Sequence, residues 1–383
     1  MTEPSRLNST RPRDPRVDFF RGLALIIIFI VHVPMNPLGD LMPGKFGFSD
    51  SAEIFVFCSG LAAAFAYGRI YDNEGFAAGT VQVGRRVWHL YWAHIAIFLV
   101  IVSMNVQFDR WAGTGTMFVD GFNHGPFLVD QSGEILTALL TLRYVPNFFD
   151  ILPTYIVVMA MVPLVMALAR ISTYAVAAFV YCMWIIGDLP WLELPAEPWS
   201  DRVWFFDPFS WQMLFFVGFA IGRGWLPAPP RRRWAVALAL AIIIASVPFA
   251  HHGLYNAIGF SAWTTEIISR LNDKTHLGVA RVVHFAALAY VAFYVSGPLG
   301  DRLHGQIARF VRVVGSQALP VFLVGQVLSV LGGFILQMTA MATLAVVVVN
   351  VAGVLVLYAV AVTMTTVARK RAQAVPVLAR VSD

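Results

Sequence analysis

Apolar residues recur along this chain in segments of about 20, separated by polar stretches. A helix of that length crosses the hydrocarbon core of a bilayer, because each residue adds about 1.5 Å. Ten such segments are expected, at residues 19–38, 50–70, 87–106, 148–169, 172–188, 207–223, 234–250, 282–299, 318–338 and 341–367. The pattern predicts an all-α, polytopic transmembrane helical bundle with about ten spans.

Basic residues between the apolar segments predict the orientation of the chain. When the N-terminus is placed in the cytoplasm, 20 of the 27 lysine and arginine residues fall on the cytoplasmic side. This asymmetry follows the positive-inside rule and places both termini in the cytoplasm. We expect one transmembrane domain, residues 16–370, between two cytoplasmic tails, residues 1–15 and 371–383, of which the first is disordered.

Composition agrees with a membrane protein. The chain is 58% hydrophobic and 13% charged, with a mean hydropathy of +0.70, whereas soluble domains are about 25% charged. Its isoelectric point of about 9.4 would suit a nucleic-acid partner, but the basic residues alternate with apolar segments. A lipid bilayer is therefore the expected partner and nucleic acid is not. Cys58 and Cys182 show no metal-site spacing, so no metal is expected.

The first apolar segment carries two ionisable residues, in the sequence RGLALIIIFIVH from Arg21 to His32. Eleven residues of helix are roughly 16 Å and about three turns, so both side chains lie on one face. Charged groups inside a span are costly and mark functional sites. Arg21 is expected near the cytoplasmic end and His32 beyond the midplane. A core histidine bonded to a backbone carbonyl is the alternative for His32.

Further polar side chains lie on other predicted spans, most of them in the outer half. They are Glu53, His94, Asp150, Tyr155, Asp207, Trp211, Gln212, Arg281 and His284. Arg16, Arg85 and Arg86 join Arg21 at the inner surface. This asymmetry suggests an anionic ligand that enters from the cytoplasm and a hydroxyl-rich ligand that enters from outside. Interfacial anchoring of Glu53 and topology signalling by the arginines are the alternatives.

Three classes of function remain open from the residues. An enzyme would use His32 as a general base, with Glu53 to orient the ring. A proton-coupled transporter would use His32, Glu53 and His94 as a relay, although no internal repeat or pair of interrupted helices is visible. A non-catalytic scaffold is the third. The sequence contains no phosphate-binding loop, G-x-S-x-G or HExxH motif.

Several sequence blocks are similar to a known group of enzymes. The R-x-D-x-x-R-G motif from Arg16, followed by the R-x10-H spacing, resembles the membrane acyltransferase-3 superfamily, as does AEIFVFCSG in the second segment. The segments DILPTYIVVM, DPFSWQMLFFVGFAIG, RVVHFAALAYVAFYVSGPL and ALPVFLVGQVLS resemble the OpgC family, succinyltransferases of osmoregulated periplasmic glucans. The similarity extends from Arg16 to about residue 365.

This resemblance implies a multi-pass enzyme of the bacterial inner membrane. It would take an acyl group from acyl-CoA, most simply succinyl-CoA, and deliver it to a hydroxyl of a periplasmic glucan. His32 would be the general base, supported by Glu53, or else a transient acyl carrier. Arg21 would bind the CoA phosphates, with Arg16, Arg85 and Arg86. Arg281, beside His284, would pair with the succinyl carboxylate. The acyl donor and the acceptor stay open.

Overall fold

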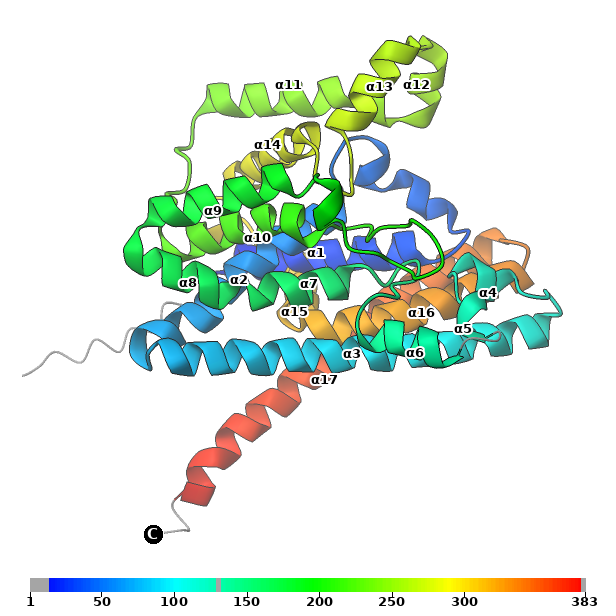
Figure 1. Ribbon diagram of the computed structural model, residues 1–383, viewed down its shortest axis with the longest axis horizontal. Helices are drawn as coiled ribbons and strands as arrows, with labels where there is room; N and C mark the ends of the chain where they lie inside the picture. Colours follow the sequence, from blue (N-terminus) through cyan, green and yellow to red (C-terminus); the bar gives the residue numbers. More distant parts are fainter. Residues whose placement is uncertain (1–13, 129–131, 380–383) are drawn as a thin grey trace, which may run out of the picture.

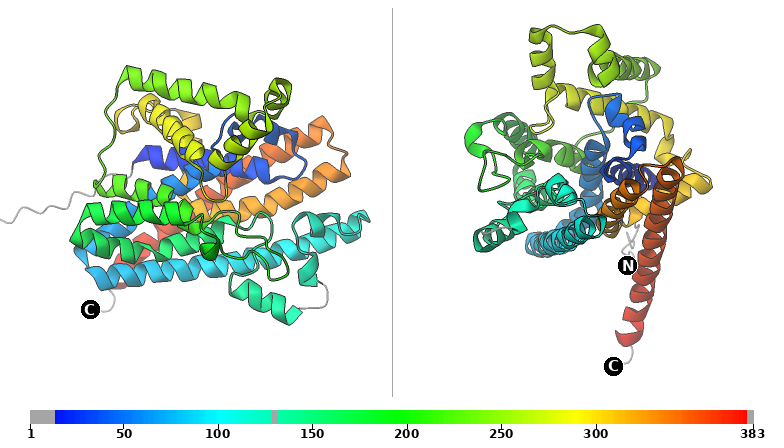
Figure 2. Two further views of the ribbon diagram at one scale, coloured as in Figure 1. Left: turned by 45° about the horizontal axis from the view of Figure 1, so that its top comes forward. Right: turned by 90° about the vertical axis from the view of Figure 1, so that its right-hand side faces the viewer.

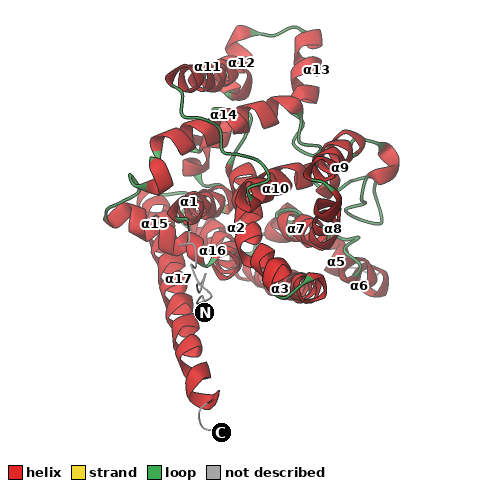
Figure 3. Cartoon of the chain, turned by 90° about the vertical axis from the view of Figure 1, so that its left-hand side faces the viewer, coloured by secondary structure: helices red, strands yellow, loops and turns green. Residues whose placement is uncertain are grey.

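The computed structural model describes residues 14–128 and 132–379 of the chain. Helices make up all the regular secondary structure in these residues, apart from one isolated bridge between Pro195 and Val203 (Figure 3). The all-α class predicted from the apolar pattern is therefore confirmed. Most of the predicted first tail, and the last residues of the second tail, lie outside the described ranges.

Seventeen α-helices and four short 3-10 helices follow one another in the described ranges. The N-terminal half contains α1 (Pro15–His32), η1 (Pro37–Leu41), η2 (Pro43–Lys45), α2 (Ser51–Asn73), α3 (Phe76–Ala112), α4 (Met117–Gly121), α5 (Gly125–Leu128), α6 (Ser132–Leu140), α7 (Ile151–Ala160), α8 (Val162–Ile171) and α9 (Thr173–Ile186). The C-terminal half contains η3 (Pro190–Leu192), α10 (Pro208–Arg223), α11 (Arg233–Ala250), α12 (His252–Ile258), α13 (Ala262–Leu271), α14 (Val279–Val295), η4 (Pro298–Gly300), α15 (Gln306–Ser316), α16 (Ala318–Met338) and α17 (Thr343–Ala379).

Each predicted apolar segment coincides with a helix or a helix pair. Six helical stretches in the described residues are long and apolar enough to cross a membrane, which supports a multi-pass membrane protein. They are Ser51–Asn73, Phe76–Ala112, Ile151–Ile171, Arg233–Ala250, Ala318–Met338 and Thr343–Lys370. The apolar helices α9 and α14 are shorter. The count of ten spans and the cytoplasmic placement of both termini stay predictions.

One boundary differs from the prediction in a way that affects the site. The first helix was expected over residues 19–38, but α1 ends at His32. Pro34 and Pro37 follow, and a residue that precedes proline is disfavoured in the helical conformation. His32 is therefore the last residue of α1. Helix α17 continues past residue 370 to Ala379, so the predicted second tail begins within a helix.

The centre of the bundle is formed by α1, which packs against α2, α15 and α16, while α2 packs against α10 (Figure 1). Glycines allow two of these close approaches. A β-carbon at Gly22 of α1 or at Gly315 of α15 would collide with the backbone of the facing helix, and Gly60 and Gly218 have the same role between α2 and α10. Small residues at such crossings are typical of membrane helices.

The remaining helices surround this centre. Helix α3 lies against α7 and α16, and α11 packs on α14 at the edge of the molecule (Figure 1). The C-terminal part of α17 projects away from the bundle (Figure 2). Helix α1, which carries Arg21, is thus packed between α2, α15 and α16 at the centre of the bundle.

Candidate functional site

Arg21 is held in place by its own helix and by α15. Its Nε atom donates to the carbonyl oxygen of Gly315 at 2.7 Å, and Nη2 lies 3.3 Å from Oδ1 of Asp18. The residue is 7% exposed. The carbonyl of Gly315 can come this close because Gly22 has no side chain between the helices. The R-x-D-x-x-R-G motif therefore fixes the direction of a buried guanidinium.

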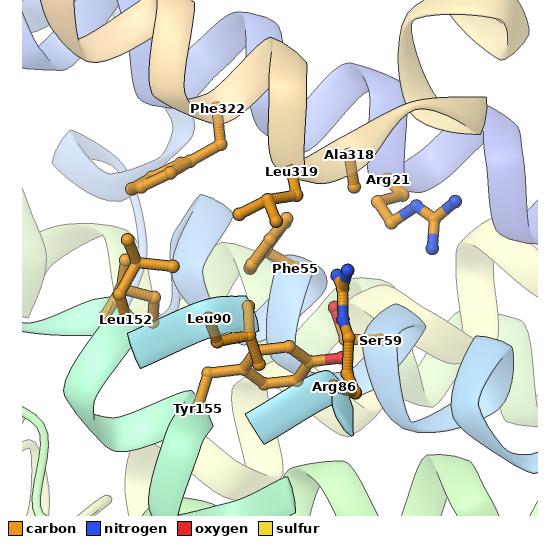
Figure 4. Close-up of a pocket in the computed structure, with 11 residues that line it drawn as sticks. Arg21, Phe55, Ser59, Arg86, Leu90, Leu152, Tyr155, Ala318, Leu319 and Phe322 are labelled. Carbon is orange, nitrogen blue, oxygen red and sulfur yellow. The ribbon is translucent and has the colours of Figure 1, made fainter. Parts of the chain in front are cut away.

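A cavity joins Arg21 to a second arginine, Arg86 of α3. Its lining comes from α1, α2, α3, α7 and α16, and consists of Arg21, Phe55, Ser59, Arg86, Leu90, Ile151, Leu152, Tyr155, Ala318, Leu319 and Phe322. Figure 4 shows both guanidinium groups at one end of the cavity, with the hydroxyl groups of Ser59 and Tyr155 beside Arg86. The other end is apolar, with Phe322 and Leu152. One end thus suits an anion and the other an uncharged chain.

A smaller second cavity continues along α1 and α16. It is lined by Leu25, Ile28, Phe29, Val321, Phe322, Gly325 and Gln326. Phe322 lines both cavities, and its ring stacks on that of Phe55 with 6.2 Å between centroids. The cavities therefore follow the same two helices from Arg21 toward the end of α1, with an aromatic pair at their boundary.

His32 lies beyond this second cavity. Its Nδ1 atom is 2.8 Å from Oε1 of Gln326, and the ring of Phe148 meets its ring edge-on at 5.3 Å between centroids. Asp50 and Lys274 are near enough to act on the charge of the imidazole. The ring is partly exposed. Arg21 and His32 thus lie on one continuous helix, with His32 as its last residue.

Two ion pairs lie at the N-terminal end of α2. Nζ of Lys274 is 2.5 Å from Oδ2 of Asp50, and Nη2 of Arg281 is 2.5 Å from Oε1 of Glu53. Asp50 caps α2, and Glu53 completes the capping box by accepting from the backbone N–H of Asp50 at 2.8 Å. Glu53 was expected to orient His32. Its carboxylate is instead occupied by Arg281 and by the cap, and the hydrogen-bond partner of the imidazole is Gln326.

Arg281 was expected to bind a substrate carboxylate, and this pairing changes that expectation. The guanidinium bonds Glu53 through both Nε and Nη2. It also lies 3.8 Å from Asp50. A ligand carboxylate would have to compete with two acids for it. His284, on the same face of α14, accepts through Nδ1 from the Ser49 hydroxyl at 2.7 Å and from the Ser49 backbone N–H at 3.2 Å. Both residues therefore tie α14 to the start of α2.

Trp211 and Asp207 anchor the loop between α13 and α14, which carries Lys274. Trp211 is fully buried, and its indole N–H donates to the carbonyl of Lys274 at 2.9 Å. The backbone N–H of Asp207 donates to the carbonyl of Thr275 at 3.1 Å, while its carboxylate caps α10. These two predicted binding residues thus hold Lys274 over the end of α2.

The other predicted outer residues make internal contacts. Asp150 accepts from the backbone N–H of Phe205 at 3.3 Å, and Gln212 donates to the carbonyl of Val180 at 2.8 Å. His94 is fully buried, with the ring of Phe149 at 6.2 Å between centroids. Tyr155, also expected among them, lines the cavity of the arginines instead.

The four predicted inner arginines separate into two groups. Arg21 and Arg86 line one cavity. Arg16 pairs with Asp14 at 2.6 Å and lies over the ring of Phe293. Arg85 is exposed on α3. The structure therefore brings together two of the four.

Asp188, Asp273 and His276 form a cluster whose ligand atoms lie within 4.8 Å of one another. His276 Nδ1 is 2.7 Å from Asp273 Oδ2 and 3.3 Å from Asp188 Oδ1. The hydrogen bond to Asp273 raises the pKa of His276. Desolvation by burial would raise the pKa of Asp273, but the bond to His276 outweighs it with other nearby donors, and the pKa of Asp273 is lowered. An internal ion pair accounts for this arrangement.

Five residues at the site were missed in the sequence. They are Asp50, Ser59, Lys274, Phe322 and Gln326. The sequence did offer a signal for Gln326, because it is the only residue with a side-chain amide in the apolar block ALPVFLVGQVLS. Lys274 offered none, because a lysine in a long loop is ordinary and only the fold places it beside Asp50.

Comparisons with known proteins give one match. The family model described as OpgC protein matches residues 13–369, nearly the whole chain. Searches of curated proteins and of solved structures returned no match. The matched range includes both cavities, the R-x10-H spacing and the outer ion pairs. On this evidence the chain belongs to the OpgC protein family.

Proposed function

We propose that this chain is a membrane acyltransferase that moves a succinyl group from succinyl-CoA, bound at the inner face, to a hydroxyl of a periplasmic glucan. Membership of the OpgC family implies a role in glucan succinylation. The observation that carries the mechanism is that Arg21 and Arg86 converge on one end of a cavity whose course leads toward His32. The expected location is the bacterial inner membrane.

The arginine end of the cavity is the proposed donor site. CoA carries phosphates, and guanidinium groups bind phosphate through paired, charge-assisted hydrogen bonds. Arg21 is oriented by Gly315 and Asp18, and Arg86 comes from a separate helix. Two cations on different helices match a ligand with several phosphates. Arg16 and Arg85 would contribute to the field at the inner mouth rather than to direct contacts.

The apolar part of the path is the proposed channel for the pantetheine arm and its thioester. It runs past Leu319, Phe322 and Phe55 toward Gln326. The ring stack of Phe55 and Phe322 narrows this path. A thioester that passes it reaches the end of α1, where His32 lies.

His32 is the proposed general base. Its imidazole takes the proton of the glucan hydroxyl, and the oxygen attacks the thioester carbonyl to form a tetrahedral intermediate. Collapse breaks the C–S bond, the succinyl ester remains on the glucan, and the CoA thiolate leaves with the proton from the imidazolium. A neutral imidazole suits this proton transfer near neutral pH.

Lys274 is the better-placed partner for the succinyl carboxylate. Its side chain is 30% exposed and pairs with one carboxylate, that of Asp50, whereas the side chain of Arg281 is 7% exposed and faces the carboxylates of both Glu53 and Asp50. The segment that precedes α10 also presents Phe205 and Phe206, whose rings face the Lys274 ammonium. Arg281 keeps the structural role of orienting α14 against α2.

The transporter alternative would need a connected relay of His32, Glu53 and His94. Each of the three has a different neighbour: Gln326 for His32, Arg281 for Glu53 and the ring of Phe149 for His94. Proteoliposomes that take up a solute without any dependence on CoA would favour the transporter.

Binding of succinyl-CoA to the purified protein tests the donor site. We expect Arg86→Ala to weaken binding by about 10- to 100-fold, because hydrogen bonds between charged groups contribute about 1.5–3 kcal/mol. Arg85→Ala, one residue away and exposed, is the matched control and should weaken binding by less than about threefold, because solvent screens its charge. Equal affinity of the two variants for succinyl-CoA would contradict the site.

A further inference from the structure

Gln326 makes two hydrogen bonds at the end of the second cavity. Its Nε2 donates to the carbonyl oxygen of Phe148 at 2.9 Å, and its Oε1 lies 2.8 Å from Nδ1 of His32. One amide of α16 therefore joins α1 to the loop that precedes α7. Gln326 is 6% exposed, so water does not readily replace either partner.

The chemistry of these groups determines the direction of both bonds. A backbone carbonyl only accepts, so the amide must present its NH2 group to Phe148. The amide oxygen then faces His32, and an oxygen of this kind also only accepts. Turning the amide over would place two oxygens against each other at Phe148. The proton between Gln326 and His32 must therefore reside on Nδ1.

The loop is built so that its carbonyl holds this position. Phe148 has a φ of 70°, a left-handed conformation that a bulky residue rarely adopts. The backbone N–H of Phe149 donates to the carbonyl of Pro146 at 3.1 Å, which closes the turn. The Phe148 ring meets the rings of His32 and Phe122. A strained residue held on several sides fixes a carbonyl that a relaxed turn would point elsewhere.

We propose that Gln326 is a positioning residue that fixes the tautomer of His32, with the proton on Nδ1 and the lone pair on Nε2. This inference rests on the proposed role of His32 as general base and names the atom that performs it. Nε2 is the nitrogen that removes the proton from the glucan hydroxyl. Gln326 thereby has the orienting role that the sequence suggested for Glu53. A neutral amide achieves this without adding a charge to the apolar path.

Nitrogen-15 NMR of the full-length protein in nanodiscs, labelled at histidine, tests the tautomer directly. The signals of His32 are assigned by their loss in His32→Gln, and the spectra are recorded where the imidazole is neutral. The wild type should show a protonated Nδ1 and a bare Nε2. Gln326→Leu should move the ring toward the opposite tautomer. Gln326→Glu, with its proton on the oxygen that donates to the Phe148 carbonyl, keeps an accepting oxygen facing Nδ1 and should preserve the wild-type tautomer.

Kinetics on the same proteins give the second measurement. We expect Gln326→Leu to lower kcat about tenfold, the effect of one ordinary hydrogen bond, with KM for succinyl-CoA unchanged. Ser329→Ala is the control on the same helix, since that hydroxyl bonds backbone carbonyls at Phe29 and Gly325. It should leave both the tautomer and kcat as in the wild type.

The two measurements separate the inference from the proposed function. A wild-type ring with its proton on Nε2, or an unchanged tautomer in Gln326→Leu, would overturn the role of Gln326 whatever the activity. A wild type with the proton on Nδ1 but no acyl transfer would refute the proposed function and leave the tautomer assignment intact. If Gln326→Leu does not fold, the wild-type spectrum and that of Gln326→Glu still decide the question.

Discussion

Arg281 and Glu53 form a buried ion pair that joins α14 to the first turn of α2. Both guanidinium nitrogens on one side of Arg281 bond the same carboxylate oxygen, at 2.8 Å from Nε and 2.5 Å from Nη2. Glu53 is fully buried and Arg281 is 5% exposed. Neither charge can be hydrated if the other is removed, so the pair acts as a single structural unit.

Removal of one member should therefore destabilise the protein strongly. We expect Glu53→Ala to lower the free energy of unfolding by about 3–5 kcal/mol, the usual cost of an uncompensated buried charge. The double variant Glu53→Leu with Arg281→Met should recover much of this loss. Thermal unfolding in detergent, followed by circular dichroism, measures both.

The exposed pair between Arg270 and Glu266 provides the control for this measurement. Its side chains are 78% and 63% exposed, with 2.7 Å between Nη2 and Oε1. Glu266→Ala should cost less than about 1 kcal/mol, since solvent screens such pairs. A similar loss in Glu53→Ala and Glu266→Ala would show that the buried pair does not hold α14 to α2.

His32 supplies the sharpest test of the mechanism. His32→Ala should reduce kcat for glucan succinylation by about 10²–10⁴, the contribution of one positioned base. Binding of succinyl-CoA should persist, because Arg21 and Arg86 lie at the other end of the path. His89→Ala, an exposed histidine of α3, should retain wild-type rates. A loss smaller than tenfold in His32→Ala would remove the general-base role.

The sequence predicted the long apolar helices and one helix that carries both Arg21 and His32. Apolar length alone located the helices, and the helical repeat alone placed Arg21 and His32 on one face. Side-chain pairing was not predictable, because it depends on how helices far apart in the chain meet. Glu53 was assigned to His32 on matching depth, yet Arg281, 228 residues away, takes its carboxylate. Gln326 was overlooked because nothing in one apolar block shows which neighbour its amide will face.

Lys274 should determine the preference for a charged acyl group. Lys274→Met should raise KM for succinyl-CoA by about tenfold or more while leaving acetyl-CoA turnover unchanged, because only the succinyl group has a free carboxylate to pair. Steady-state kinetics with both donors measures the ratio. Lys45→Met, an outer lysine with a 58% exposed side chain, is the control. Equal changes for the two donors would refute selectivity through Lys274.

His276 should make stability depend on pH. Its hydrogen bond with Asp273 raises its pKa from 6.5, so the stabilisation is complete below pH 6.5 and disappears as the pH rises through the higher folded value. The pKa of Asp273 is lowered from its ordinary value of 3.8, so the stabilisation that its carboxylate contributes is lost only in acid, below pH 3.8. Asp188, Glu193 and Asp207 also face the imidazole and favour its charged form.

The midpoint of thermal unfolding, measured across pH, tests this dependence. The wild type should exceed His276→Gln in acid to neutral buffer, and the two should converge in alkaline buffer. His304→Gln, an exposed histidine, should follow the wild type throughout. A constant difference between the wild type and His276→Gln at every pH would refute the ion-pair explanation.

Gly315 should link stability to donor binding. A β-carbon there would collide with the carbonyl of Asp18, so Gly315→Ala must push α15 away from α1 and weaken the hydrogen bond to Arg21. We expect a loss of about 1–3 kcal/mol in the free energy of unfolding, together with weaker succinyl-CoA binding in calorimetry. Gly84→Ala, in a helix where a β-carbon meets open space, should instead stabilise by up to about 1 kcal/mol. Wild-type affinity for succinyl-CoA in a correctly folded Gly315→Ala protein would mean that the Gly315 carbonyl does not orient Arg21 for the donor.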